Sequence, residues 1–368
     1  MIYFDNASTT PICKTALDNL IEFSKNKFFN ASAIYKQGIE NKKAIDDCKK
    51  LIAYFLGVKF EDNIIFTGSA TEANNLALQG AYKKSFKKIL VSEGEHACTY
   101  NAALALKNRG VDVEFIKLSP NGEIDYSDLE EKLSSEVSFI SIMHVNNETG
   151  SINDLKRIAE LKKKYCPRAI LHSDGVQAFG KIKYALPKEV DLYTISAHKI
   201  HGPKGVGALY VRDKKLINPI IFGGGQEYNL RSGTENVANI MGFMGAIQEI
   251  DYDCGVDEVK QAFINNLDPK TGFVINGNKT TPYILSLSYS GLNGETLVHM
   301  LEEKGYLISR GSACSGNKIG NRILSSMGLD KNLIQGSIRV SFSRCNTPDE
   351  AAEVCQFLNA SVAKLKQI

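Results

Sequence analysis

The stretch from Tyr193 to Val211 contains a lysine that is placed as a nucleophile would be. An apolar run leads into the polar turn Ser196-Ala-His-Lys199, a Gly-Pro-Lys-Gly loop follows, and a second apolar run leaves it. This pattern predicts two strands joined at a turn that holds Lys199 at the edge of a sheet. A lysine amine desolvated there could form a Schiff base with an aldehyde. Taken alone, the stretch also fits a plain β-hairpin with a solvated lysine.

A second segment, Thr67-Gly-Ser-Ala-Thr-Glu-Ala-Asn-Asn75, leads from an apolar run into a helical pattern. The backbone N–H groups of Ala70 and Thr71 would lie at the N-terminus of that helix, where they suit a phosphate group. The alternative for this segment is an ordinary Ser or Thr helix cap that Glu72 assists.

Polar groups also follow other apolar runs. Asp174 stands at the end of one run, where a buried carboxylate requires a cation or several hydrogen-bond donors. His96 follows another run and could stack on a ring or move protons. Asn146 and Asn147 could turn the chain or bind a ligand, and the segment Arg231-Ser-Gly-Thr234 suits an oxyanion.

The last third of the chain adds a thiol and a guanidinium. Cys314 lies among Gly, Ser and Ala, without the apolar neighbours that usually bury a free cysteine. Arg310 is close enough in sequence to lower the pKa of this thiol. Arg339 lies within an apolar run and requires an anion, which could be a substrate carboxylate or a structural carboxylate.

Strands that alternate with helices must position these groups. Short apolar runs are typical of strands covered on both faces, and with helical patterns between them they predict an α/β domain with a mostly parallel sheet. Ligands of such sheets bind at the carboxyl ends of the strands. The predicted strands are 63–66, 88–91, 111–116, 137–142, 169–172, 192–195 and 207–211, with helices at 72–83 and 155–165 among them.

One ligand would satisfy these groups together, namely pyridoxal phosphate, an aromatic aldehyde that carries a phosphate. Its phosphate would lie at Ala70 and Thr71, its ring nitrogen would face Asp174, and its aldehyde would bind Lys199.

The sequence resembles the class V aminotransferase family of fold-type I pyridoxal phosphate enzymes. Within it, the chain is most similar to the cysteine desulfurases of the iron–sulfur cluster and nitrogenase type, from Phe4 to the final helix. The matching motifs occur in the family's order: Phe4-Asp-Asn-Ala-Ser-Thr-Thr-Pro11, Thr71-Glu72 with Asn74-Asn75, His144-Val-Asn-Asn-Glu148, Asp174 with Gln177, Ser196-Ala-His-Lys199, Arg231-Ser-Gly-Thr234, Gly311-Ser-Ala-Cys314 and Ser337-Ile-Arg339.

The resemblance implies a role for each matched residue. Lys199 would form the Schiff base and move a proton, His96 would stack on the ring and shuttle protons, and Cys314 would be the nucleophile that receives sulfur from L-cysteine. Asn147 and Arg339 would hold the substrate carboxylate. The cofactor-binding set would be Ala70, Thr71, Asn147, Asp174, Gln177, Ser196, His198, Lys199 and, from the neighbouring subunit, Thr234.

The resemblance also implies the architecture and the partners. We expect a large α/β domain over 13–250 with a seven-stranded sheet, and a small α+β domain formed by 1–12 and 251–368. The strands 284–288 and 337–342 and a helix over 348–366 fall in the small domain. We expect a cytoplasmic homodimer that passes sulfur from Cys314 to an acceptor or iron–sulfur scaffold protein. We expect no bound metal ion, apart from a contact between Cys314 and a nascent iron–sulfur cluster.

Two positions depart from the family pattern. The segment Phe29-Asn-Ala-Ser32 lacks the proline that usually follows Asn30, and Arg310 stands where a small or hydroxyl residue is usual.

If Arg310 activates Cys314, we expect the Arg310→Ala substitution to raise the pKa of the thiol. Titration of the thiol in both proteins measures this change, and an unchanged pKa would reject the activation.

Composition bounds the class of protein. The 368 residues carry a formal net charge of +3, which argues neither for nor against a nucleic-acid partner, and no direct contact with a nucleic acid is expected. No apolar run is long enough for a membrane helix, so a membrane is not an expected partner. The eight cysteines contain no Cys-x-x-Cys pair, which favours reduced thiols over a disulfide framework or zinc site. An aminotransferase, a selenocysteine lyase and a protein with an idle site that binds a partner remain alternatives, and the sulfur pathway stays open.

Overall fold

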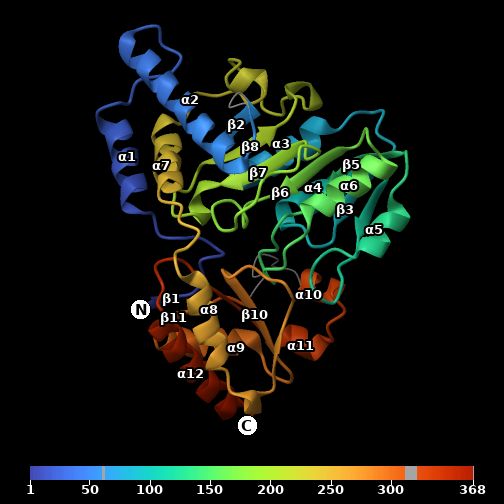
Figure 1. The fold of residues 1–368 in the computed structure, drawn as a ribbon, viewed down its shortest axis with the longest axis vertical. Coiled ribbons are helices and arrows are strands. Elements are labelled where there is room, and N and C mark those ends of the chain that lie inside the picture. The colour runs from blue at the N-terminus through green and yellow to red at the C-terminus, as the bar shows by residue number, and fades with distance from the viewer. Residues whose placement is uncertain (60–62, 311–320, 368) are drawn as a thin grey trace.

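The computed structural model describes residues 1–59, 63–310 and 321–367 (Figure 1). A seven-stranded sheet forms the centre of the larger lobe, in the order β2-β8-β7-β6-β5-β3-β4. β8 is antiparallel to both of its neighbours, and the other pairs are parallel. The strands are β2 (Ile64–Thr67), β3 (Lys88–Ser92), β4 (Val113–Ile116), β5 (Val137–Ser141), β6 (Ile170–Asp174), β7 (Leu192–Ser196) and β8 (Gly207–Val211).

Helices cover both faces of this sheet because the strands are apolar on both sides. Ile64 and Phe66 of β2 face one core, while Ile65 between them faces the other, as the two-residue period of a strand requires. One core also contains residues of α2, α5, α6 and α7, and the other contains residues of α3 and α4. The helices of this lobe are α1 (Lys14–Lys25), α2 (Lys36–Leu56), α3 (Ala70–Ala81), α4 (Ala97–Lys107), α5 (Tyr126–Lys132), α6 (Leu155–Tyr165) and α7 (Val237–Gln248).

The smaller lobe has its own core and lies at one end of the larger lobe (Figure 1). An antiparallel sheet in the order β12-β10-β9 packs with α8, α9 and α12. Its elements are α8 (Val256–Asn265), β9 (Phe273–Ile275), β10 (Ile284–Tyr289), α9 (Gly294–Glu302), β11 (Tyr306–Leu307), α10 (Arg322–Ser326), α11 (Lys331–Gln335), β12 (Ser337–Ser341) and α12 (Pro348–Leu365).

The N-terminal segment joins this smaller lobe. β1 (Ile2–Tyr3) pairs in parallel with β11, and Phe4 packs in the core of the smaller lobe. The amide of Asn6 and the backbone N–H of Ala7 then donate to Ser341 at the end of β12. The segment therefore continues from the smaller lobe toward the carboxyl ends of the large sheet.

The structure confirms the predicted fold class, including all seven strands of the large sheet. The helix predicted from residue 72 begins two residues earlier, at Ala70, because Ser69 caps it by accepting the N–H of Glu72. The domain boundaries at 12 and 250 stay a prediction. Within the described part of the chain, no helix is both long and apolar enough to cross a membrane.

Candidate active site

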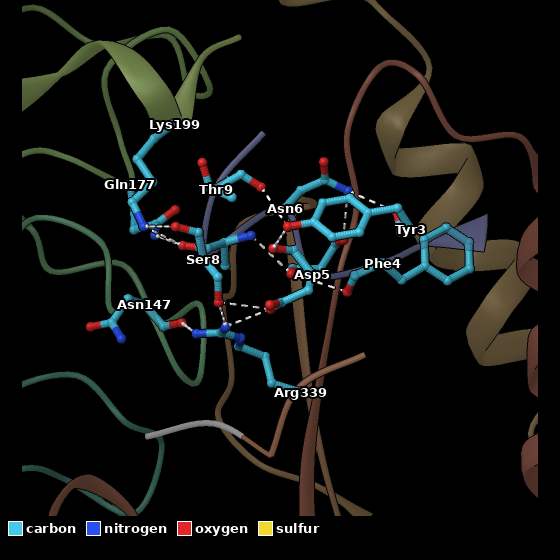
Figure 2. A network of polar contacts seen from close by, with 12 residues as sticks. Tyr3, Phe4, Asp5, Asn6, Ser8, Thr9, Asn147, Gln177, Lys199 and Arg339 are labelled. Atoms are coloured by element: carbon cyan, nitrogen blue, oxygen red, sulfur yellow. Dashed lines mark hydrogen bonds and ion pairs between the residues drawn. The ribbon is translucent and has the colours of Figure 1, made fainter. Parts of the chain in front are cut away.

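Lys199 lies just beyond β7, in the short 3-10 helix Ala197–Lys199, at the carboxyl edge of the large sheet. Its Nζ donates to the carbonyl oxygens of Ala7 at 2.7 Å and Ser8 at 2.6 Å (Figure 2). The N-terminal segment therefore binds the amine through two backbone carbonyl groups, and neither of these two hydrogen bonds involves a carboxylate. The two carbonyl groups of the N-terminal segment thus position the amine at this edge of the sheet.

Asp174 ends β6, the strand next to β7, and is only 4% exposed. One carboxylate oxygen accepts the amide of Asn74 at 2.7 Å, and the other accepts the backbone N–H of Val176 at 2.9 Å. These donors offset the cost of burying the negative charge. The sequence indicated that Asp174 requires a cation or several donors, and the structure supplies two donors.

The start of α3 and the end of β7 form a small polar cup. Ala70 and Thr71 are the first residues of α3, whose first N–H groups have no acceptor within the helix. Ser196 is 1% exposed, and its Oγ has no hydrogen-bond partner among the described residues. Gly207 permits this approach, because a Cβ there would lie 2.9 Å from the nitrogen of Ala70. The cap by Ser69 confirms the capping interpretation of this segment, and the anion interpretation, which the cap does not exclude, stays a prediction.

His198 lies beside this cup, and its Nδ1 is 3.2 Å from the hydroxyl of Thr9. Burial, with Lys199 and Lys204 next in effect, lowers the pKa of His198 to about 4. The imidazole is therefore neutral near pH 7 and could only donate a neutral N–H to an anion.

Gln177 lies one turn beyond Asp174 and is buried. Its amide nitrogen donates to the carbonyl of Ala7 at 2.9 Å, and its amide oxygen accepts Nζ of Lys181 at 2.7 Å. Lys181 is itself 7% exposed, and burial lowers its pKa to about 7, with Lys199 and Arg339 acting in the same direction. Sequence reasoning missed Lys181, because a lysine in a turn between two strands gives no sequence signal of burial.

The titration of Lys181 predicts how stability changes with pH. Its pKa in the folded protein, about 7, lies below its ordinary value of 10.5. Between these values the unfolded chain binds more protons, so this group makes the folded state more stable as pH rises from about 7 toward about 10. We expect wild type to gain unfolding free energy relative to Lys181→Met between pH 7 and 9.

Urea denaturation at the two pH values measures this gain. Lys183→Met is the matched control, because Lys183 is exposed and should leave the pH dependence unchanged. A constant difference between wild type and Lys181→Met across the range would contradict the prediction.

His96 follows β3 and caps the N-terminus of α4. Its Nδ1 accepts the backbone N–H of Cys98 at 3.3 Å and lies 3.0 Å from the sulfur of the same residue. Burial is the largest effect on the pKa of His96 and lowers it, and Lys199 acts in the same direction. Asp174 opposes this change.

Arg339 lies on β12 and is 4% exposed. Its Nη1 donates to the carbonyl of Asn147 at 2.8 Å, and its Nη2 donates to Asp5 at 2.8 Å and to the hydroxyl of Ser8 at 2.7 Å (Figure 2). The anion required by this arginine is thus supplied by Asp5, which is the structural alternative raised by the sequence. The amide of Asn147 points away from Arg339 in Figure 2, and its Oδ1 is buried without a partner among the described residues.

Cys314 lies outside the described residues, and so does most of the motif around it. On one side of that gap, Ser309 exchanges two backbone hydrogen bonds with Arg339, at 3.0 and 2.7 Å. On the other side, Asn321 donates to the carboxylate of Glu148, and Arg322 donates to the carbonyl of Glu95. Both ends of the gap are therefore attached to the edge of the site.

Of the remaining predicted residues, Thr234, Arg310 and Asn30 are exposed and Arg231 is partly buried. Thr234 is exposed, and its contact with a neighbouring subunit stays a prediction. Arg231, in the same motif, pairs with Glu72 at 2.7 Å. Arg310 pairs with Glu295 at 3.2 Å, so its effect on Cys314 also stays a prediction. Asn30 is exposed, and its side chain accepts the N–H of Ser32 in a local turn.

Comparisons with known proteins agree with this architecture. The family model for class-V aminotransferases matches residues 2–354. Cysteine desulfurase IscS of Dictyoglomus turgidum is 35% identical over 380 residues, which cover 100% of this chain and 96% of that protein. A solved NifS-like protein has a TM-score of 0.91 and 31% identity, with 100% of both chains covered. The solved structure of SspA in complex with cysteine has a TM-score of 0.84 and 29% identity, and covers 93% of this chain and 99% of that one.

The chain belongs to the class-V aminotransferase family, among relatives of the IscS and NifS cysteine desulfurases.

Proposed function

We propose that this protein is a pyridoxal phosphate-dependent cysteine desulfurase, which converts L-cysteine to L-alanine and leaves the sulfur as a persulfide on Cys314. The observation that supports it best is the full-length match to cysteine desulfurases, combined with a buried edge that brings Lys199 and Asp174 to adjacent strands.

The described residues fit pyridoxal phosphate. The unpartnered hydroxyl of Ser196 and the free N–H groups at the start of α3 suit the phosphate. The carboxylate of Asp174 suits a protonated ring nitrogen, and Lys199 suits the aldehyde carbon. When bound, this cofactor supplies an electron-accepting ring that stabilises negative charge at the substrate's Cα.

Residues of the chain would then transfer the proton, bind the substrate carboxylate and accept the sulfur. Lys199 would hold the aldehyde of the cofactor and, as a free amine, would accept the proton from the substrate's Cα and return it. Arg339 would bind the substrate carboxylate, either in place of Asp5 or through its Nε, which has no hydrogen-bond partner among the described residues, with Asn147 beside it. The Cys314 thiolate forms a bond to the substrate sulfur while the carbon–sulfur bond breaks, and protonation of the carbon gives alanine.

The proposal includes the assembly and the destination of sulfur. A homodimer is supported by exposed apolar side chains on the surface of α1, α2 and the loop between them. These include Leu17, Ile21, Phe28, Ile34 and Ile39, of which Ile34 is 94% exposed. We propose that the dimer acts in the cytoplasm as a sulfurtransferase, passing sulfur to an acceptor in iron–sulfur cluster assembly or transfer-RNA thiolation.

A product analysis tests the reaction. The purified protein is incubated with L-cysteine and a thiol reductant, and sulfide and alanine are measured together. We expect equal amounts of the two products. Conversion of a keto acid to an amino acid, without sulfide, would instead indicate an aminotransferase, and preference for selenocysteine would indicate a selenocysteine lyase.

Substitution of Arg339 tests the substrate carboxylate site. Arg339→Lys keeps the positive charge but loses the planar fork that holds Asp5, Ser8 and Asn147. We expect kcat/KM for L-cysteine to fall by about 10- to 100-fold, mainly through KM, because hydrogen bonds to charged groups contribute about 1.5–3 kcal/mol. Steady-state kinetics measure the change. Arg310→Lys is the exposed control, and an unchanged KM in Arg339→Lys would remove Arg339 from the substrate site.

A further inference from the structure

A chain of polar contacts connects Asp174 to His96 through Asn74 and Cys98. Asn74, on α3, is fully buried and donates its amide nitrogen to Asp174 at 2.7 Å. The same nitrogen lies 3.2 Å from the sulfur of Cys98, on α4. That sulfur in turn lies 3.0 Å from Nδ1 of His96.

One order of donors and acceptors satisfies all three contacts, although the sulfur of Cys98 also lies 4.0 Å from the hydroxyl of Thr99. The carboxylate of Asp174 accepts, so the Asn74 atom that faces it must be the amide NH₂ group. The second hydrogen of that group points to the Cys98 sulfur, which therefore acts as an acceptor. The S–H of Cys98 is then available to donate to Nδ1 of His96.

The Cys98 thiol keeps its proton near neutral pH. Burial is the largest effect and raises the pKa of Cys98, and Asp174 acts in the same direction. The backbone N–H of Cys98 also donates to Nδ1 of His96, at 3.3 Å. Two donors therefore meet at one ring nitrogen, which must carry a lone pair.

We propose that Asn74 and Cys98 are positioning residues that fix His96 in the neutral form with its proton on Nε2. In this state Nε2–H faces away from Nδ1 and can donate a proton or a hydrogen bond to a reacting group. The doubly protonated imidazolium would direct an Nδ1–H against both donors of Cys98, so the pair opposes its formation. The positioning of His96 does not depend on the proposed function, but its importance for proton transfer does.

The charges that face His96 come from four separate elements. Asp174 on β6 and Glu148 after β5 favour protonation, while Lys199 after β7 and Arg322 on α10 oppose it. The substitution of Cys98 alters none of these four charged side chains. A change in the titration of His96 in such a variant therefore reports the contribution of Cys98.

Histidine modification provides a test that requires no enzyme turnover. Diethyl pyrocarbonate acylates unprotonated imidazole, and peptide mass spectrometry follows each of the six histidines of the chain separately as pH varies. In Cys98→Ala one donor to Nδ1 is lost, and we expect the apparent pKa of His96 to rise by about half to one pH unit. Cys98→Ser retains a donor and should restore the wild-type value.

Two controls separate this effect from a structural one. His299, which is exposed beside Glu302 and distant in sequence, should titrate identically in all variants. Cys98→Val fills the site without a donor, so it should behave as Cys98→Ala even if the alanine variant folds poorly. An unchanged apparent pKa of His96 in Cys98→Ala and Cys98→Val, or a failure of Cys98→Ser to restore it, would overturn the inference. Failure of the desulfurase assay alone would not.

Discussion

Lys199→Ala should lose sulfide release by about 10³-fold or more while still binding pyridoxal phosphate. The expected loss follows from the two functions proposed for Lys199, which are to attach the cofactor and to move the substrate proton. Binding should persist because Asp174, Ser196 and the first turn of α3 are untouched. We therefore expect covalent attachment of the cofactor to depend on Lys199 and noncovalent binding of the cofactor to depend on the other groups.

Borohydride reduction followed by peptide mass spectrometry checks this prediction. Wild type should retain a reduced pyridoxyl phosphate group on the peptide that contains Lys199, and Lys199→Ala should retain none. Lys204→Ala is the matched control, because Lys204 is an exposed lysine in the same turn. Attachment of the label to a different lysine in wild type would show that the site is assigned wrongly.

Cys314→Ala should abolish the formation of sulfide and alanine from L-cysteine, with a fall of at least about 10³-fold. In the proposed reaction the carbon–sulfur bond breaks only if a nucleophile accepts the sulfur, and Cys314, which lies among Gly, Ser and Ala, is the proposed nucleophile. Cofactor binding should be unchanged, since none of the groups that fit the cofactor lies in the segment around Cys314.

A gain of one sulfur atom on the Cys314 peptide, measured without reductant, would identify the carrier directly. Cys345→Ala is the matched control, because Cys345 is an exposed free thiol in the smaller lobe. Equal activity of Cys314→Ala and wild type would contradict the desulfurase mechanism and favour an aminotransferase or a lyase that needs no thiol.

The large sheet could be predicted because its strands are short apolar runs that end in polar residues. Asp174 and Lys199 were recognised from the sequence since each follows such a run, and parallel strands bring their carboxyl ends to one edge. The ends of the helices were predicted less accurately than the strands of this sheet. The helix that begins at Ala70 was placed two residues late, because the identity of the cap depends on the backbone of Ser69.

The contacts that cross between lobes could not be predicted. The carbonyl groups of Ala7 and Ser8 bind Lys199 through backbone atoms, which carry no sequence signal. Asp5 meets Arg339 over a separation of 334 residues, so no local pattern indicates the pair. Asn74 and Cys98 likewise meet across two helices, and their ordering around His96 depends on side-chain geometry alone.

The attachment of the N-terminal segment to β12 has a consequence for biosynthesis. Asn6 is hydrogen-bonded to Ser341, 335 residues away, and the next two residues supply the acceptors for Lys199. On a ribosome, the large sheet can emerge long before β12 is made, because chains leave the ribosome N-terminus first. The hydrogen bonds that hold Lys199 can therefore be completed only when translation is nearly finished and the smaller lobe has formed.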